Sequence, residues 1–275
     1  YDAPAWSVEP ESKVTEIQRD IFNRPINLIR RNTANTLRAE RKYVYDGHGQ
    51  LCKTIEPETG ATVSGYDAAG NLAWSAAGLS GGDYANPLDC SYVAANASGR
   101  VSNRTYDQRN RLKTLLFPDG RGNQVWNYEA DGLPKDITTF NGPGNTTPVV
   151  NSYGYNKRRL LTEEYSHQPD WYTWRIGYDY DPIGNLRWQS YPTGLTLDYA
   201  PNALGQPTQA RDQNNKAYAS GAQYYPNGAM KQFSYGNGIV HTMTQNARQL
   251  PQRVTSSGGV NDFSYNYDKN ANITN

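Results

Sequence analysis

The sequence contains few of the residues on which most metal, redox and nucleophilic sites depend. Its 275 residues include three His, two Cys and two Met. His48, His167 and His241 stand apart, and none has neighbours at the spacing of metal ligands. The sequence has no nucleophile elbow, HExxH helix, phosphate-binding loop or Cys-x-x-Cys pair. We therefore predict no catalytic residue, no metal site and no cofactor, and we expect that the chain is not an enzyme.

An excess of one charge and long apolar runs are also missing. The 27 Lys and Arg residues nearly balance the 26 Asp and Glu residues, and the formal net charge is +1. Such a chain has no overall field that attracts nucleic acid or anionic lipid. We interpret the short basic runs 38–42 and 157–159 as solvated charges. No stretch approaches the roughly 18 apolar residues of a membrane span, so we predict neither a nucleic-acid partner nor a transmembrane segment.

The two cysteines, Cys52 and Cys90, do not define a disulfide framework. They could pair with each other. A chain of this length with only two cysteines more often carries them as free, small hydrophobic side chains, and we interpret them in that way.

Tyrosine and glycine are abundant instead. The chain has 22 Tyr against 5 Phe, together with 25 Gly, and its mean hydropathy is −0.84. Tyr and Trp tolerate one wet face, so this composition favours an extended sheet with a thin core over a compact α/β body. The high aromatic content argues against disorder.

The phrase Tyr-Asp-x-x-Gly-Asn-Leu recurs along the chain and indicates that one small unit has been copied many times. The clearest copies are 66–72 and 180–186, and near copies begin at Tyr45 and Tyr106. Looser copies begin at Tyr128, Tyr155, Tyr224 and Tyr267. Degenerate copies fit at Arg19, Pro201 and Thr244, and the wide gap after Tyr66 predicts one more around Tyr92.

Each residue of the phrase has a structural role. Tyr favours a half-buried strand, Asp accepts backbone N–H bonds and opens a turn, and Gly supplies the positive φ of a tight reversal. A second turn with Pro and Gly often follows, as at 118–120 and 192–194. We therefore predict two short strands and two turns in each unit. The residues to which we assign this role are Tyr45, Asp46, Gly49, Tyr66, Asp67, Gly70, Tyr106, Asp107, Tyr180, Asp181, Gly184, Tyr267 and Asp268.

Two carboxylate pairs do not form an acid–base unit. Glu163 and Glu164 point to opposite faces if they lie on a strand. In the pair Asp179 and Asp181, the second residue is the turn Asp of its repeat, so we assign it a structural role.

Trp171, Tyr172 and Trp174 form the one aromatic cluster that suggests a ligand. Such side chains could form a platform for sugar rings. Alternatively, they fill the buried face of the sheet or pair across strands. The sequence leaves both interpretations open.

These motifs resemble the YD-repeat, or RHS-repeat, family, and the resemblance extends from about Arg19 to the C-terminus. Relatives include bacterial Rhs polymorphic toxins, the C component of Tc toxins, wall-associated proteins and teneurins. The resemblance implies an all-β antiparallel meander of repeated hairpins that curls into a shell or cocoon-like strip. In the toxins, such a shell encloses a C-terminal toxin. Bacterial shells end in an Asp-Pro-x-Gly motif and an autoproteolytic site. Here the sequence 181–184 lies in mid-chain, so we transfer no protease residues.

We expect residues 1–18 to form an N-terminal lead-in and residues 19–275 to form about eleven or twelve repeats, incomplete at the C-terminus. The chain then reads as a fragment or processed piece of a longer protein. Its expected partners are the remainder of a longer RHS polypeptide, or further copies that pair through strand edges.

The first functional hypothesis is a non-enzymatic shell segment of a protein that is secreted or exposed on a bacterial surface, with a toxin cargo inside. The alternatives are a carbohydrate- or protein-binding adhesion module, with a glycan as ligand, and a self-assembling extracellular polymer.

Overall fold

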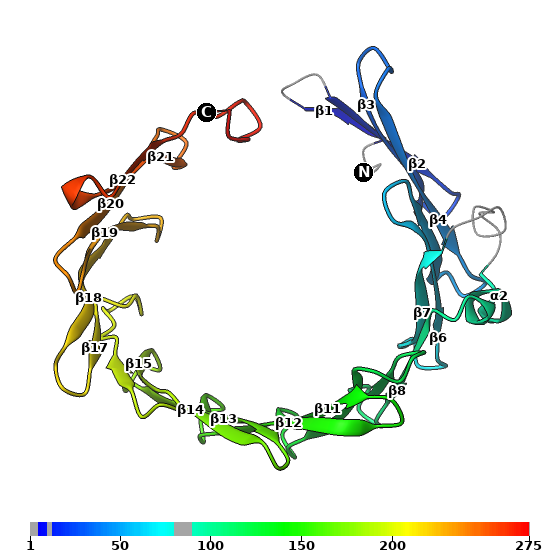
Figure 1. The fold of residues 1–275 in the computed structure, drawn as a ribbon. Coiled ribbons are helices and arrows are strands. Elements are labelled where there is room, and N and C mark those ends of the chain that lie inside the picture. The colour runs from blue at the N-terminus through cyan, green and yellow to red at the C-terminus, as the bar shows by residue number, and fades with distance from the viewer. Residues whose placement is uncertain (1–4, 10–12, 80–89, 275) are drawn as a thin grey trace. The chain divides into compact units, whose positions relative to one another are not determined.

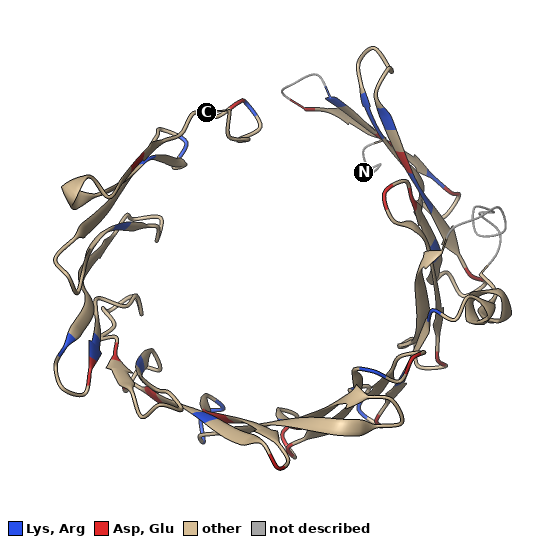
Figure 2. Cartoon of the chain, viewed as in Figure 1, with Lys and Arg blue, Asp and Glu red and all other residues tan. Residues whose placement is uncertain are grey.

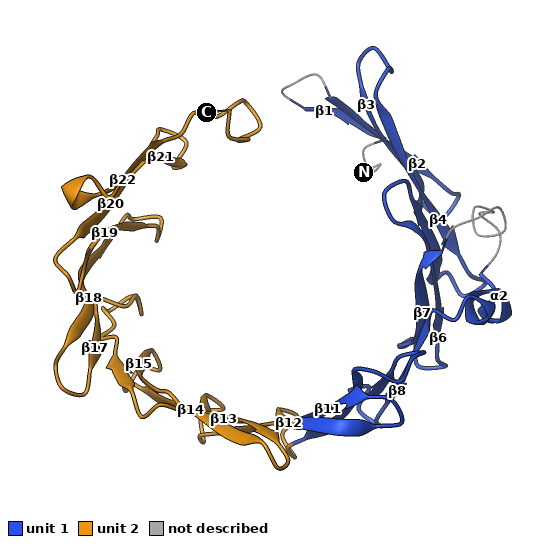
Figure 3. Ribbon diagram, viewed as in Figure 1, with its two compact units in different colours: residues 1–128, 136–149 blue, residues 129–135, 150–275 orange. Residues whose placement is uncertain are grey.

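The computed structural model describes residues 5–9, 13–79 and 90–274. The chain forms two compact units. One comprises residues 1–128 and 136–149, and the other comprises residues 129–135 and 150–275 (Figure 3). Strands dominate both units. Among the described residues, no helix is long and apolar enough to cross a membrane.

Within the described residues, the first unit contains ten complete strands, most of which Figure 1 labels. They are β1 (Trp6–Val8), β2 (Lys13–Arg19), β3 (Pro25–Asn32), β4 (Arg38–Tyr45), β5 (Leu51–Glu56), β6 (Gly60–Tyr66), β7 (Leu72–Leu79), β8 (Val101–Tyr106), β9 (Leu112–Leu116) and β10 (Asn123–Tyr128). The strands β11 (Pro134–Gly142) and β12 (Thr146–Tyr155) include residues of both units.

The second unit contains ten further strands. They are β13 (Leu161–Gln168), β14 (Tyr172–Tyr180), β15 (Leu186–Ser190), β16 (Thr196–Asp198), β17 (Ala210–Asp212), β18 (Ala217–Tyr224), β19 (Met230–Tyr235), β20 (Val240–Gln245), β21 (Pro251–Ser256) and β22 (Asn261–Ser264).

Within each unit, every strand pairs antiparallel with the strand that follows it. In the first unit this holds from β1 to β10. In the second it holds from the β12–β13 pair to β22. The prediction of an all-β antiparallel meander is therefore confirmed.

The pairing register shifts at the same place in successive repeats, immediately before the repeat Tyr. The shift falls between Val44 and Tyr45, Gly65 and Tyr66, Thr105 and Tyr106, Asp179 and Tyr180, and in other copies. In the first case Val44 pairs with Lys53 and Tyr45 with Leu51, so Cys52 is the extra residue of a β-bulge. A bulge increases the local twist of a hairpin. These hairpins are therefore twisted at the same position of the repeat, next to the repeat Tyr.

The predicted turn is present in the clear copies of the repeat. In the Tyr180 copy, the backbone N–H of Asp181 donates to the carbonyl of Asn185 at 2.9 Å, and that of Gly184 donates to the carbonyl of Asp181 at 3.0 Å. Gly184 has a φ of 99°. The Gly position also has positive φ in the Tyr45 and Tyr66 copies, at Gly49 and Gly70. Gly therefore occupies the positive-φ position of the turn in these three copies.

Two of the degenerate copies differ from the prediction. The copy assigned to Thr244 is displaced by one residue, because Asn246 opens the turn and Gln249 carries the positive φ of 62°. The copy expected around Tyr92 is absent, and helix α2 (Tyr92–Ala97) occupies that place. The side chain of Ser91 caps this helix by accepting a hydrogen bond from the backbone of Ala94 at 3.4 Å.

Helix α2 packs on an apolar cluster of the first unit. Ala95 is fully buried in a cluster to which β6, β7 and β8 contribute the other residues. Figure 1 shows the helix beside β6 and β7. Trp74 makes an edge contact with Tyr92, with ring centroids 4.8 Å apart. The cluster consists of Ala61, Val63, Ala76, Leu79, Ala95 and Val101. Most other side chains of the sheet are only partly buried, which fits the thin core that the composition indicates.

The interpretation of the cysteines as free thiols is wrong. Cys52, which is 3% exposed on β5, forms a disulfide with Cys90, and their Cα atoms are 5.7 Å apart. Cys90 lies just before α2, so the disulfide fastens the start of the helical segment to the sheet. The two residues are 38 positions apart, and nothing in the local sequence shows that the intervening chain returns to β5.

We predict that Gly184→Val lowers the free energy of unfolding by about 1–3 kcal/mol, because a β-branched residue is strained at positive φ. Gly47→Val is the matched control. Gly47 also lies in a repeat turn, but its φ is not positive and an added Cβ meets nothing within 4 Å, so we expect a change within about 0.5 kcal/mol. Urea titration of both variants measures the difference, and equal midpoints would contradict the turn assignment.

Candidate functional site

In most repeats, an Asp or Asn closes its own turn, whereas the Tyr128 and Tyr224 copies carry Glu129 and Tyr225 at that position. The Oδ1 atom of Asp46 accepts hydrogen bonds from the backbone N–H groups of His48 and Gln50, at 2.9 and 2.8 Å. The same pair of bonds occurs at Asp20, Asp67, Asp107, Asp181 and Asp268, and at Asn156, Asn202 and Asn246 where Asn replaces Asp. One side-chain oxygen thus satisfies two backbone donors that the turn would otherwise leave without a protein partner.

The residue after the Gly position completes the turn through the second carboxylate oxygen. The Nδ2 atom of Asn71 donates to Oδ2 of Asp67 at 3.0 Å, and Asn185 and Asn272 do the same in their copies. Where Arg replaces Asn, the Nε atom of Arg111 donates to Oδ2 of Asp107 at 2.7 Å. The Asn of the phrase therefore has a specific role, whereas the sequence indicated only that it leads into the next strand.

These contacts stabilise the ionised carboxylate. The hydrogen bond from the Arg111 guanidinium, followed by the backbone N–H groups of Arg111 and Arg109, lowers the pKa of Asp107 to about 2. The hydrogen bonds from the side chain and backbone of Asn71 likewise lower the pKa of Asp67.

In many of the repeats, the Tyr ties its hairpin to the preceding one. The hydroxyl of Tyr66, the last residue of β6, donates to the carbonyl of Leu51, the first residue of β5, at 2.7 Å. Leu51 holds the Leu position of the previous copy. Equivalent bonds of 2.6–2.9 Å join Tyr45 to Pro25, Tyr106 to Leu72, Tyr128 to Leu112, Tyr180 to Leu161, Tyr224 to Pro207 and Tyr267 to Pro251.

Burial raises the pKa of three of these hydroxyls, those of Tyr66, Tyr128 and Tyr180. These three therefore remain donors at neutral pH. In two copies an Arg also lies over the ring of the next Tyr. The guanidinium carbon of Arg111 is 4.3 Å from the ring centre of Tyr128, and Arg24 and Tyr45 are 4.4 Å apart in the same way.

Sequence reasoning missed one turn of this kind. The Oδ1 atom of Asp212 accepts from the backbone N–H groups of Asn214 and Lys216, both at 2.9 Å. Asn215 has a φ of 65°. No Tyr precedes Asp212, but an Asp followed three residues later by Asn is a detectable signal for this turn, because Asn tolerates positive φ.

The aromatic cluster lies at the hairpin that joins β13 to β14. The rings of Tyr172 and Trp174 are stacked, with centroids 4.4 Å apart and an angle of 26° between their planes. Trp171 contacts Tyr172 edge-on at 6.0 Å. Trp171 is 77% exposed and Trp174 is 56% exposed. The two tryptophans therefore do not fill a buried face of the second unit.

Local partners contact two of the histidines and the acidic pair of Glu163 and Glu164. The Nδ1 atom of His167 lies 2.7 Å from the hydroxyl of Thr173, and the ring of His241 lies 5.0 Å from that of Phe233. Arg175 binds Glu163 at 3.1 Å, whereas the Tyr178 hydroxyl donates to Glu164 at 2.6 Å. In the described part of the chain, no three His, Cys, Asp or Glu side chains gather as metal ligands.

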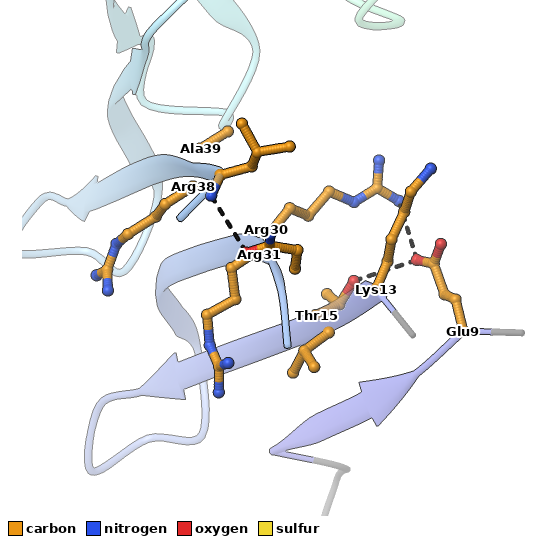
Figure 4. Close-up of a pocket in the computed structure, with 10 residues that line it drawn as sticks. Glu9, Lys13, Thr15, Arg30, Arg31, Arg38 and Ala39 are labelled. Atoms are coloured by element: carbon orange, nitrogen blue, oxygen red, sulfur yellow. Dashed lines mark hydrogen bonds and ion pairs between the residues drawn. The ribbon is translucent and has the colours of Figure 1, made fainter. Parts of the chain in front are cut away.

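A pocket of about 470 Å³ lies at the N-terminal end of the first unit (Figure 4). Its lining includes Lys13, Arg30 and Glu9. The carboxylate of Glu9 accepts a hydrogen bond from the Thr15 hydroxyl at 3.3 Å and lies 3.8 Å from the Arg30 guanidinium. An anionic ligand would have to displace this carboxylate.

Lys and Arg residues and Asp and Glu residues both occur in each of the two units (Figure 2).

Comparison with known structures finds solved structures that share this fold. No protein-family model and no curated protein matches this sequence. The Tc holotoxin pore of Photorhabdus luminescens matches 97% of this chain with a TM-score of 0.65 and 15% identity. The TcdB2–TccC3 crystal structure matches 95% with a TM-score of 0.64 and 14% identity. The TcdB2–TccC3–TEV structure matches 97% with a TM-score of 0.62 and 13% identity.

At this level of identity, the comparisons establish a shared fold. The aligned region spans 15% of each of those chains, so this chain corresponds to a small part of them. The match covers nearly the whole of this chain, so the shared fold includes nearly all of its repeats.

We predict that Tyr66→Phe lowers the free energy of unfolding by about 0.5–1.5 kcal/mol, because the Leu51 carbonyl loses its hydrogen bond from the hydroxyl. Tyr235→Phe is the control. Tyr235 is 42% exposed, and within the described residues its hydroxyl has no hydrogen-bond partner. Urea denaturation should show a lower midpoint concentration for Tyr66→Phe than for the wild type, and an unchanged midpoint for Tyr235→Phe. Equal midpoints for both variants would show that the Tyr66 hydroxyl does not contribute to stability.

We also predict that acid destabilises the chain through its turn carboxylates. The pKa of Asp107 is lower in the folded state, at about 2, than the usual value of about 3.9. Its stabilising contribution is therefore complete above pH 4 and is lost as the pH falls towards 2. Asp107→Asn should retain the turn, as Asn156 does in its own copy, and should reduce the loss of stability between pH 4 and pH 2. An unchanged pH dependence in the variant would contradict this prediction.

Proposed function

We propose that this chain is a segment of the wall of a protein shell and that the segment has no catalytic role. The single observation that carries the proposal is the series of similar antiparallel hairpins, most of them closed by an Asp or Asn and many of them tied to a neighbour by a Tyr hydroxyl. A wall requires such repetition, because each unit must present the same edge to the next.

The similarity to Tc toxin structures supports a shell of this kind. The chain covers only 15% of the matched chains, which fits a segment of a longer polypeptide. The YD-repeat motifs point to the same family of shells. We therefore propose that the complete protein encloses a cargo, and that the cargo is a toxin.

We further propose that the protein is secreted or exposed on a bacterial surface. The Cys52–Cys90 disulfide supports this location, because disulfides persist in oxidising compartments and are rare in the cytosol of most organisms. The proposed mechanism is mechanical. Twisted and bulged hairpins form a curved wall, and the wall keeps the cargo away from the surrounding solution until it is released.

The proposal is tested on the protein purified from its native source, by intact mass measurement and electron microscopy. The predicted result is a particle much heavier than the 30.7 kDa of this chain, with density enclosed by a thin wall. Limited proteolysis should then cleave the enclosed segment only after the wall is denatured. Filaments of this chain alone would replace the proposal with a structural polymer, and small isolated particles would replace it with a binding module.

A further inference from the structure

A small groove crosses three strands of the second unit and combines an exposed indole with polar side chains. Its volume is about 220 Å³. The six residues that matter are Asn151 and Tyr153 from β12, Glu164 and Ser166 from β13, and Trp174 and Ile176 from β14. The remaining lining comes from Tyr165 and Pro192.

The strand register places these six side chains on one face. Asn151 lies opposite Ser166, and Ser166 lies opposite Trp174. In the next row, Tyr153 lies opposite Glu164, and Glu164 lies opposite Ile176. Directly opposed residues of antiparallel strands share a face, with Cβ atoms about 5 Å apart. The groove is therefore built on rigid strand positions.

Trp174 supplies a flat apolar wall that is already oriented. Tyr172 lies two residues earlier on the same strand and therefore on the same face, and its ring stacks on that of Trp174 at 4.4 Å. Although Trp174 is 56% exposed, this stacking holds the indole against the sheet. A ligand with a flat, CH-rich face can pack on such a ring without first ordering it.

The polar groups of the groove can recognise hydroxyls. The Tyr178 hydroxyl donates to Oε1 of Glu164 at 2.6 Å and fixes the carboxylate, which remains an acceptor. Burial and this hydrogen bond raise the pKa of Tyr178, so it stays a donor. Within the described residues, the side chains of Asn151 and Ser166 make no hydrogen bond. The Asn151 amide and the Ser166 hydroxyl can both donate and accept. Both groups lie beside the exposed indole of Trp174 and are available to a ligand.

We propose that this groove binds one ring of a neutral saccharide. A pyranose has an apolar CH face for Trp174 and hydroxyls that both donate and accept, which Asn151, Glu164 and Ser166 can pair. The groove is smaller than the roughly 300–1,000 Å³ of sites for drug-sized ligands, so it suits a single ring of a longer chain. This binding is a separate function from the shell role, because a wall segment needs no such groove.

The test uses the purified 275-residue chain and uncharged hexasaccharides of glucose, mannose, galactose, xylose and N-acetylglucosamine, with binding followed by calorimetry and tryptophan fluorescence. At least one should bind saturably with a Kd of about 1 mM or tighter. Trp174→Ala should weaken that binding by at least about tenfold, and Trp174→Phe should restore most of it, because the stacking face is retained.

Trp171→Ala is the matched control, since Trp171 belongs to the same hairpin and is more exposed but does not line the groove. Its affinity should stay within about twofold of the wild-type value. Should Trp174→Ala fail to fold by circular dichroism, the double variant N151A and S166A tests the same site, with an expected loss of about tenfold.

Three results would overturn the proposal. The first is no saturable signal with any saccharide up to about 10 mM. The second is an equal loss of affinity in Trp171→Ala and Trp174→Ala, which would indicate general aromatic stickiness. The third is binding of tetramethylammonium chloride in place of saccharides, because an aromatic ring beside a carboxylate also attracts cations. None of these results bears on the shell role, which the particle mass and the microscopy test.

Discussion

Each hairpin of this sheet must satisfy its backbone and fix its register without a thick apolar core. The backbone of the turn is satisfied by one carboxylate or amide oxygen that accepts hydrogen bonds from two backbone N–H groups, as Asp46 does. The register between hairpins is fixed by one phenol, because the Tyr66 hydroxyl donates to the Leu51 carbonyl of the preceding hairpin. Each hydrogen bond contributes on the order of 1 kcal/mol, and their repetition supplies the order that a large core supplies in a compact domain.

This arrangement leaves the two faces of the sheet available for other uses. The hydrogen bonds of the turn and of the Tyr hydroxyl involve only main-chain groups and the side chains of the repeat phrase. The other residues on the strand faces can therefore vary. In the first unit, one face carries helix α2 and the disulfide to Cys52. In the second unit, a face carries the groove beside Trp174. One set of residues therefore builds the sheet, and another set gives a stretch of it its individual properties.

The sequence predicts what depends on local chemistry. Tyr66, Asp67 and Gly70 specify a strand and a turn within seven residues, and the strands, turns and positive φ values follow. The Tyr hydroxyl contact was not predictable, because donor and acceptor are 15 to 34 positions apart and meet only in the folded register. The Cys52–Cys90 disulfide and the groove were missed for the same reason. Asn151 becomes a neighbour of Trp174 only across two strand pairings.

The most direct test of the central claim is a double-mutant cycle that combines Asp46→Ala with Tyr66→Phe. The account holds that the closed turn of one repeat positions the Leu51 carbonyl that the next repeat's Tyr binds. The two losses of unfolding free energy should therefore be less than additive, with a coupling of about 0.5–1 kcal/mol. Additive losses, within about 0.3 kcal/mol, would mean that the turn and the tie act independently, and would contradict the account.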